Sequence, residues 1–136
     1  MIQIINLSDT ELGDAVYVGR PMPRKRMRGS PLANRHKIDA KNGITRDMCI
    51  GRFLGDLTDA RMACWEFSRG ERRRRPTLYQ ERLSAEIDHL TLLYLETGHL
   101  TLACWCHPQS CHANVIASVI ERTASNIRAL LSGVPA

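Results

Sequence analysis

Hydrophobic residues along the chain form short runs rich in β-branched side chains and longer segments with a helical period. Residues 2–7 and 15–18 are apolar runs bounded by polar turns, and they predict two strands. Residues 100–105 are apolar on both faces, as expected of a strand in the middle of a covered sheet. Residues 19–41 are basic, rich in Pro and Gly, and without a period, so we predict a long loop of the kind that usually carries function.

Three further segments show the spacing of amphipathic helices. The first begins at residues 45–47, and its expected apolar face consists of Met48, Phe53, Leu54, Leu57 and Met62. After a basic break at 69–76, with Pro76 expected in the first helical turn, the second carries Leu83, Ile87, Leu90, Leu93 and Tyr94 and ends at Gly98. The third follows a short loop at 107–110 and carries Val115, Val119, Ile127, Leu130 and Leu131.

The order of these elements is strand, strand, long loop, helix, helix, strand, helix. This order predicts the α/β class: a small layered domain with a short, largely parallel sheet flanked by helices. A chain of 136 residues that is 43% apolar can build one core, and a second independent core is not expected. Residues 1–136 are therefore predicted to form a single domain.

The charge of the chain points to polyanionic partners. Its net charge is +5, and only three of its 19 basic residues are Lys. Arg binds phosphate through a planar, two-pronged guanidinium, and nucleic acid is the commonest polyanion that a basic domain meets. The alternative is a GC-rich genome that encodes Arg where others encode Lys. DNA is therefore the expected partner.

The cysteine content and the start of the chain indicate the compartment. An odd number of cysteines, five, without a secretory leader argues for reduced thiols, and no apolar stretch approaches the length that spans a membrane. We therefore expect a cytoplasmic protein, of a bacterium or of a phage-infected cell, that does not associate with a membrane.

The segment from Cys104 to His112 is the richest in reactive side chains. It follows a predicted strand and leads into a helix, where unpaired backbone N–H groups favour anions and lower the pKa of a thiol. Three interpretations compete with simple burial of small thiols. Zinc could be bound by Cys104, Cys106, Cys111 and His112, although the spacing lacks paired C-x2-C ligands. A thiol of Cys106 or Cys111 could be activated by His107 or His112. The interpretation we favour is a polar substrate pocket without metal or cofactor.

Three sequence blocks resemble the domain of unknown function 4326 family, which occurs in bacteria and phages. They are Tyr-Val-Gly-Arg at 17–20, Gly-Ser-Pro-Leu-Ala-Asn at 29–34, and Leu-Ala-Cys-Trp-Cys at 102–106 with Pro108 and Cys-His-Ala at 111–113. The resemblance covers most of the chain, and it implies a shared fold and pocket and a place in DNA metabolism. The chain has Arg35 and His36 where the family usually has Pro-Phe, and Asn114 where it usually has Asp. If that Asp is catalytic in relatives, Asn114 could not act as a base here.

The 29–34 block and the segment from Cys104 to His112 both follow predicted strands, so we expect them to meet at one edge of the sheet. The predicted catalytic residues are Asn34, Asp39, His107 and His112, and for Asn34 a turn-stabilising role is the alternative. The predicted substrate pocket is formed by Tyr17, Gly19, Arg20, Gly29, Ser30, Pro31, Cys106 and Cys111. The predicted phosphate contacts, which could instead be solvated loops, are Arg24, Lys25, Arg26, Arg28, Arg72, Arg73, Arg74 and Arg75.

The sequence carries no phosphate-binding G-x-x-x-x-G-K-[ST], no dinucleotide G-x-G-x-x-G and no zinc-deaminase motif. A small basic domain with a polar pocket fits hydrolysis of an N-glycosidic bond, which needs positioned water and charge stabilisation. We therefore predict a nucleic-acid enzyme, specifically a DNA glycosylase that removes a modified or damaged base. The alternatives are an enzyme of free nucleotides or nucleosides and a non-catalytic nucleic-acid-binding accessory protein.

Overall fold

The computed structural model describes residues 1–105 and 111–133. Its sheet has three parallel strands in the order β1 (Ile2–Asn6), β3 (Leu100–Cys104) and β2 (Val16–Tyr17). Ile2 pairs with Leu100 at the start of β1, and Tyr17 pairs with Ala103 near the end of β3. The predicted parallel sheet and the central place of the 100–105 run are confirmed, because β3 has a neighbour on each side.

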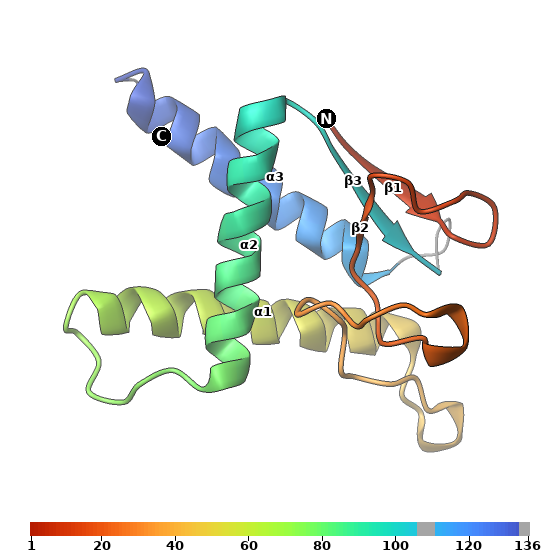
Figure 1. Cartoon of the computed structure of the whole chain (residues 1–136). Helices are drawn as coiled ribbons and strands as arrows, with labels where there is room; N and C mark the ends of the chain where they lie inside the picture. The colour runs from red at the N-terminus through yellow and green to blue at the C-terminus, as the bar shows by residue number, and fades with distance from the viewer. Residues whose placement is uncertain (106–110, 134–136) are drawn as a thin grey trace.

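Three helices complete the α/β domain: α1 (Arg46–Ser68), α2 (Leu78–Thr97) and α3 (His112–Leu131). Helix α3 packs on β1 and β3, α2 packs on β3 and α3, and α1 packs on the other two helices. Figure 1 shows α1 lying across the foot of α2, with the sheet beside the upper part of α2. The long 19–45 segment descends from β2 to the start of α1, so it lies below the carboxyl ends of the strands (Figure 1).

Local chemistry fixes where the helices begin and end. Thr45 caps α1 by accepting a 3.2 Å hydrogen bond from the Met48 amide, and Gly98 ends α2 with φ +79°, so both predicted boundaries are confirmed. The prediction that Pro76 lies in the first turn of α2 is wrong. Thr77 and Gln80 form a capping box, with reciprocal bonds of 3.0 and 3.1 Å, so the helix begins after Pro76.

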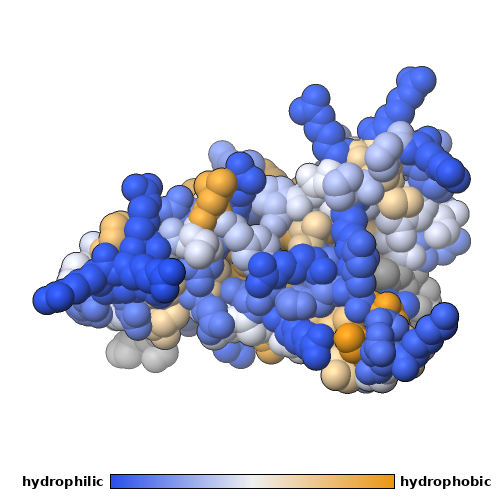
Figure 2. Space-filling view, turned by 90° about the horizontal axis from the view of Figure 1, so that it is seen from below, coloured by the Kyte–Doolittle hydropathy of each residue, from blue (hydrophilic) through white to orange (hydrophobic). Residues whose placement is uncertain are grey.

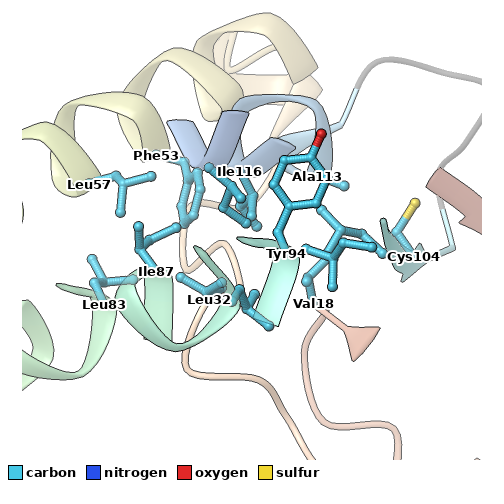
Figure 3. Packing of buried hydrophobic residues seen from close by; sticks show 14 of the residues in the cluster. Val18, Leu32, Phe53, Leu57, Leu83, Ile87, Tyr94, Cys104, Ala113 and Ile116 are labelled. Atoms are coloured by element: carbon cyan, nitrogen blue, oxygen red, sulfur yellow. The ribbon is translucent and has the colours of Figure 1, made fainter. Parts of the chain in front are cut away.

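The core lies between the three helices and the sheet (Figure 3), and the apolar face predicted for α2 is largely confirmed. The faces of the other two helices are only partly as predicted. On α1, Phe53 and Leu57 are buried, but Met48, Leu54 and Met62 are exposed, and small residues such as Ala60 take the inner positions. Small side chains at these positions let the helices approach closely.

On α3 the buried residues are His112, Ala113, Ile116, Ile120 and Ala124, whereas Leu130 and Leu131 are 74% and 83% exposed. The carboxyl end of α3 extends past α2 in Figure 1, which agrees with the exposure of residues near that end of the helix. In the described part of the chain, no helix is both long and apolar enough to span a bilayer.

Candidate functional site

A cavity of about 480 Å³ opens where the carboxyl ends of β2 and β3 meet the start of α3. This is the edge at which open α/β sheets bind ligands, and the volume lies in the range of small-molecule sites. The described residues that line it are Tyr17, Gly19, Arg20, Met22, Asn34, His36, Lys37, Ile38, Arg46, Cys49, Ile50, Cys104, Trp105, Cys111 and His112. Residues from the 19–45 loop, from β3 and from two helix starts therefore surround one space.

The structure brings together six of the residues predicted for the site. Tyr17, Gly19, Arg20, Asn34, Cys111 and His112 all line the cavity. Cys106 and His107 lie outside the described residues, so their predicted roles stay predictions.

The remaining predicted residues lie outside the cavity wall. The hydroxyl of Ser30 accepts from the Leu32 amide at 3.0 Å and braces the loop. A Cβ at Gly29 would lie 2.6 Å from the ring of Pro21, so only glycine fits this close approach. Pro31 adjoins these two residues and does not line the cavity. Asp39 is also absent from the lining; it accepts from the Asn42 side chain at 2.6 Å and precedes a short 3₁₀ turn, Ala40–Asn42.

Arg20 holds the long loop in place. Its Nε donates to the carbonyl of Asn34 and its Nη2 to the carbonyl of His36, both at 2.8 Å. The hydroxyl of Tyr17 donates to the carbonyl of Arg20 at 2.6 Å. The two-pronged guanidinium thereby joins the end of β2 to a segment 14–16 residues further along the chain.

Asn34 forms one hydrogen bond typical of a turn residue and one that joins the loop to α1. Its Oδ1 accepts from the His36 amide at 2.9 Å, and its Nδ2 donates to the carbonyl of Cys49 at 3.1 Å. The first bond matches the turn-stabilising alternative. The catalytic role of Asn34 stays a prediction that its position in the cavity wall allows.

His112 is the first residue of α3, and its imidazole is fixed. Nε2 lies 2.6 Å from the carbonyl of Val18, and because a carbonyl only accepts, Nε2 is the nitrogen that carries the proton. The ring also meets Phe53 edge to face, with centroids 5.1 Å apart. Burial lowers the pKa of His112, and the charge of Arg20 lowers it further; together they outweigh the opposing hydrogen bonds to the backbone of Val18 and Leu32. The folded protein therefore holds a neutral imidazole here.

The start of α3 is capped by the residues next to His112. The thiol of Cys111 accepts from the Ala113 amide, and the side chain of Asn114 accepts from the Cys111 amide, both at 3.2 Å. Asn114 does not line the cavity. Asn114, one of the residues that depart from the family pattern, is therefore part of a helix cap in this chain.

The neutral state of His112 predicts how stability changes with pH. Its pKa lies below the ordinary 6.5 in the folded state, so below about pH 6.5 the unfolded chain binds a proton that the folded one does not. We expect His112 to make the free energy of unfolding fall as pH decreases from 6.5 to 5, by at most about 1.4 kcal/mol per pH unit. Urea unfolding of the wild type and of His112→Asn over this range measures it. The difference between the two curves isolates His112, and parallel curves would contradict the assignment.

A second cluster, which the sequence reasoning missed, lies beside the cavity around Asp56 of α1. Its Oδ2 accepts from Nε2 of His36 at 2.8 Å, from Nε of Arg35 at 3.1 Å and from the hydroxyl of Tyr79 at 3.1 Å. Burial tends to raise the pKa of Asp56, but the hydrogen bonds of His36, Arg35 and Tyr79 together outweigh burial and lower it. Burial and the Asp56 charge raise the pKa of Tyr79 to about 12. Asp56 is therefore an ionised carboxylate with three donors.

The thiols are arranged around the same cavity. Cys49, Cys104 and Cys111 line it, and Cys49 and Cys64 are free thiols. Among residues 1–105 and 111–133, no group of three or more His, Cys, Asp or Glu side chains could hold a metal ion. The zinc alternative also involves Cys106, which lies outside the described residues.

The two basic segments lie at opposite ends of α1. The first adjoins the cavity: Lys25 Nζ lies 4.2 Å from the ring centroid of Trp105 in the cavity wall. The second follows the far end of α1, which at 23 residues is about 34 Å long, and there Arg75 pairs with Glu81 at 2.9 Å. Hydrophilic side chains project at both ends of the face seen in Figure 2, as expected from this separation.

The comparisons with known proteins agree with the three sequence blocks. No curated protein and no solved structure matches the chain significantly. The family model described as Domain of unknown function (DUF4326) matches residues 5–122 of the 136. The chain therefore belongs to the DUF4326 family.

Proposed function

We propose that the protein is a nucleic-acid enzyme that hydrolyses the N-glycosidic bond of a modified or damaged DNA base flipped into the cavity. The observation that carries the proposal is the cavity itself, which combines aromatic and cationic side chains at the ligand-binding edge of the sheet. A flipped base needs a closed pocket with a face to stack on and hydrogen-bonding groups around its edge.

The aromatic part of the wall suits a base. Trp105 and Tyr17 both line the cavity, and stacking on an aromatic ring contributes about 1–3 kcal/mol per base. The Lys25 ammonium lies over one face of the Trp105 ring, so a cation suited to bind phosphate adjoins the aromatic part of the wall.

The charge of the wall suits the leaving group. Arg20, Lys37 and Arg46 line the cavity, and none of its described lining residues carries a carboxylate. When an N-glycosidic bond breaks, the bonding electron pair leaves with the base. Cations in the wall of the site stabilise that developing negative charge.

An enzyme of free nucleotides or nucleosides is the second candidate, because cations line the cavity itself as well as the surface beside it. A nucleotide phosphate could bind these cations without a polynucleotide. Salt-sensitive binding of duplex DNA distinguishes the two, because a free nucleotide releases few counterions.

The test is incubation of the purified protein with duplex oligonucleotides that carry a panel of modified bases, followed by mass analysis. We expect release of a free base and an abasic site from one or more substrates. Intact DNA across the panel together with turnover of free nucleotides would favour the second candidate. Intact DNA with salt-sensitive binding and no turnover of either would indicate an accessory binding protein.

The separation of the basic segments predicts different roles on a short duplex. A duplex of about eight base pairs is about 27 Å long at 3.4 Å per pair, so one centred at the cavity does not reach the far end of α1. We expect replacement of Lys25, Arg26 and Arg28 by Gln to weaken binding and to reduce the slope of log K against log salt by about 0.9 per lost phosphate contact. Replacement of Arg72, Arg73 and Arg74 by Gln is the matched control. Equal effects of the two triple variants would contradict placement of the DNA over the cavity.

A further inference from the structure

His36 is held in the cavity wall at three points. Its backbone N–H donates to Oδ1 of Asn34 at 2.9 Å, and its carbonyl accepts from Nη2 of Arg20 at 2.8 Å. Its imidazole Nε2 lies 2.8 Å from Oδ2 of Asp56, and both side chains are largely shielded from solvent, with exposures of 22% and 16%. A side chain positioned this way keeps one orientation without reorganisation.

The partner of His36 determines which ring nitrogen carries the proton. Asp56 is ionised, because its three donors hold the pKa of that carboxyl below the ordinary value. A carboxylate only accepts, so Nε2 of His36 must be the donor. In the neutral imidazole the lone pair then lies on Nδ1. Within residues 1–105 and 111–133, Nδ1 has no hydrogen-bond partner.

We propose that His36 and Asp56 form a general-base dyad of the cavity, in which Nδ1 of His36 takes a proton from an attacking water molecule. The same arrangement, a carboxylate that orients an imidazole and stabilises its protonated form, recurs in unrelated hydrolases. Of the two histidines that line the described cavity, His112 is buried and uses Nε2 for a backbone carbonyl, whereas His36 is partly exposed and has a carboxylate on Nε2. His36 is therefore the histidine whose geometry fits the role of general base.

The inference rests on the proposed function for its substrate. The water oxygen forms a bond to the anomeric carbon, the bond from that carbon to the base nitrogen breaks, and the electron pair leaves with the base. One water proton moves to Nδ1 of His36 and is then released to solvent. The departing base takes up one proton from solvent, so water is divided between sugar and base and no other reactant is needed.

The dyad is tested first without any substrate. Long-range ¹H–¹⁵N NMR spectra of the neutral ring are expected to show His36 as the Nε2–H tautomer, with an Nε2 proton that exchanges slowly. Asp56→Ala is expected to make this Nε2 proton exchange rapidly. The control is Asp88→Ala, which removes the 2.6 Å ion pair between Arg61 of α1 and Asp88 of α2 and should leave the exchange of the Nε2 proton slow. An Nδ1–H tautomer in the wild type would overturn the proposal.

Diethyl pyrocarbonate measures the nucleophilicity of Nδ1 directly. We expect mass spectrometry to find modification of His36 in the folded wild type, and a smaller rate in Asp56→Ala if that variant folds. His89, which is exposed on α2, gives the reference rate for an unassisted imidazole. A His36 that stays unmodified while His89 reacts would also overturn the proposal.

Enzyme activity then distinguishes a His36 that acts as general base from a His36 that only anchors the loop. His36→Gln keeps an N–H donor for Asp56 and loses the basic nitrogen, so we expect base release to fall by about 10²–10⁴-fold in kcat with little change in KM or in the unfolding midpoint. His89→Gln is the matched control and should retain full activity. An unchanged kcat in His36→Gln would refute the dyad and leave the proposed function standing. If the wild type releases no base although the tautomer and the reactivity are as expected, the proposed function fails and the dyad stands.

Discussion

Replacing Phe53 by Ala is expected to lower the free energy of unfolding by about 3–5 kcal/mol, the largest effect on stability that we predict. Phe53 has no exposed surface and lies in the middle of the core, between α1 and the other helices (Figure 3). Its loss removes a large apolar surface and leaves a cavity that close-packed neighbours such as Leu57 and Ile116 fill only in part. Domains of this size have only about 5–15 kcal/mol of stability, so the variant should unfold at markedly lower urea concentration.

Phe53 also links the core to the site, because its ring contacts the imidazole of His112 edge to face. Phe53→Leu is the matched control: it keeps most of the apolar volume and removes the aromatic edge. We expect it to lose well under half of the stability that Phe53→Ala loses, while the NMR signals of the His112 ring shift in both variants. A loss below about 1 kcal/mol in Phe53→Ala would contradict the central place of this residue.

The sheet could be predicted from the sequence because each strand has a local signature. The 100–105 run is apolar on both faces, with Thr101 as its one polar residue, as expected of a strand covered on both sides, and it forms the central β3. Thr45 and Gly98 marked helix ends because capping depends on neighbours a few residues away. The faces of α1 and α3 were less predictable. Small residues such as Ala60 and Ala124 are buried where helices meet, and the sequence alone does not show where those crossings lie.

The candidate site was predictable to the extent that its residues follow strands. Arg20 and His112 come after β2 and β3, and parallel strands bring such residues to one edge. Asp56 carried no signal of this kind, because it lies in the middle of α1 and its partner His36 is 20 residues earlier in an irregular loop. Only the tertiary path of that loop brings the two together. Asp39 does not line the cavity, because the loop turns its carboxylate toward Asn42, and its catalytic role stays a prediction.

The path of that loop depends on Arg20, and its replacement by Lys is expected to have the largest effect on activity after loss of His36 itself. The guanidinium spans two carbonyls, those of Asn34 and His36, at 2.8 Å each. An ammonium keeps the charge but cannot reproduce this planar two-point contact. His36 would then lose one of its backbone anchors, and a displacement of about 1 Å at a reacting group costs on the order of 10²-fold in rate.

We therefore expect Arg20→Lys to reduce base release about 100-fold while the core remains folded, because Arg20 is exposed and contributes little apolar packing. Amide hydrogen exchange is expected to accelerate at His36, whose N–H donates to Asn34 in the segment that Arg20 holds, and not at β3. Arg52→Lys, an exposed substitution on α1 outside the cavity wall, is the control for the change of side chain alone. If Arg20→Lys keeps wild-type turnover while exchange at His36 rises, loop order is not what positions the imidazole, and the contact with Asp56 alone must do so. If both turnover and exchange stay unchanged, the contacts of Arg20 with the two carbonyls do not order the loop. Its order must then come from the burial of Leu32 in the core.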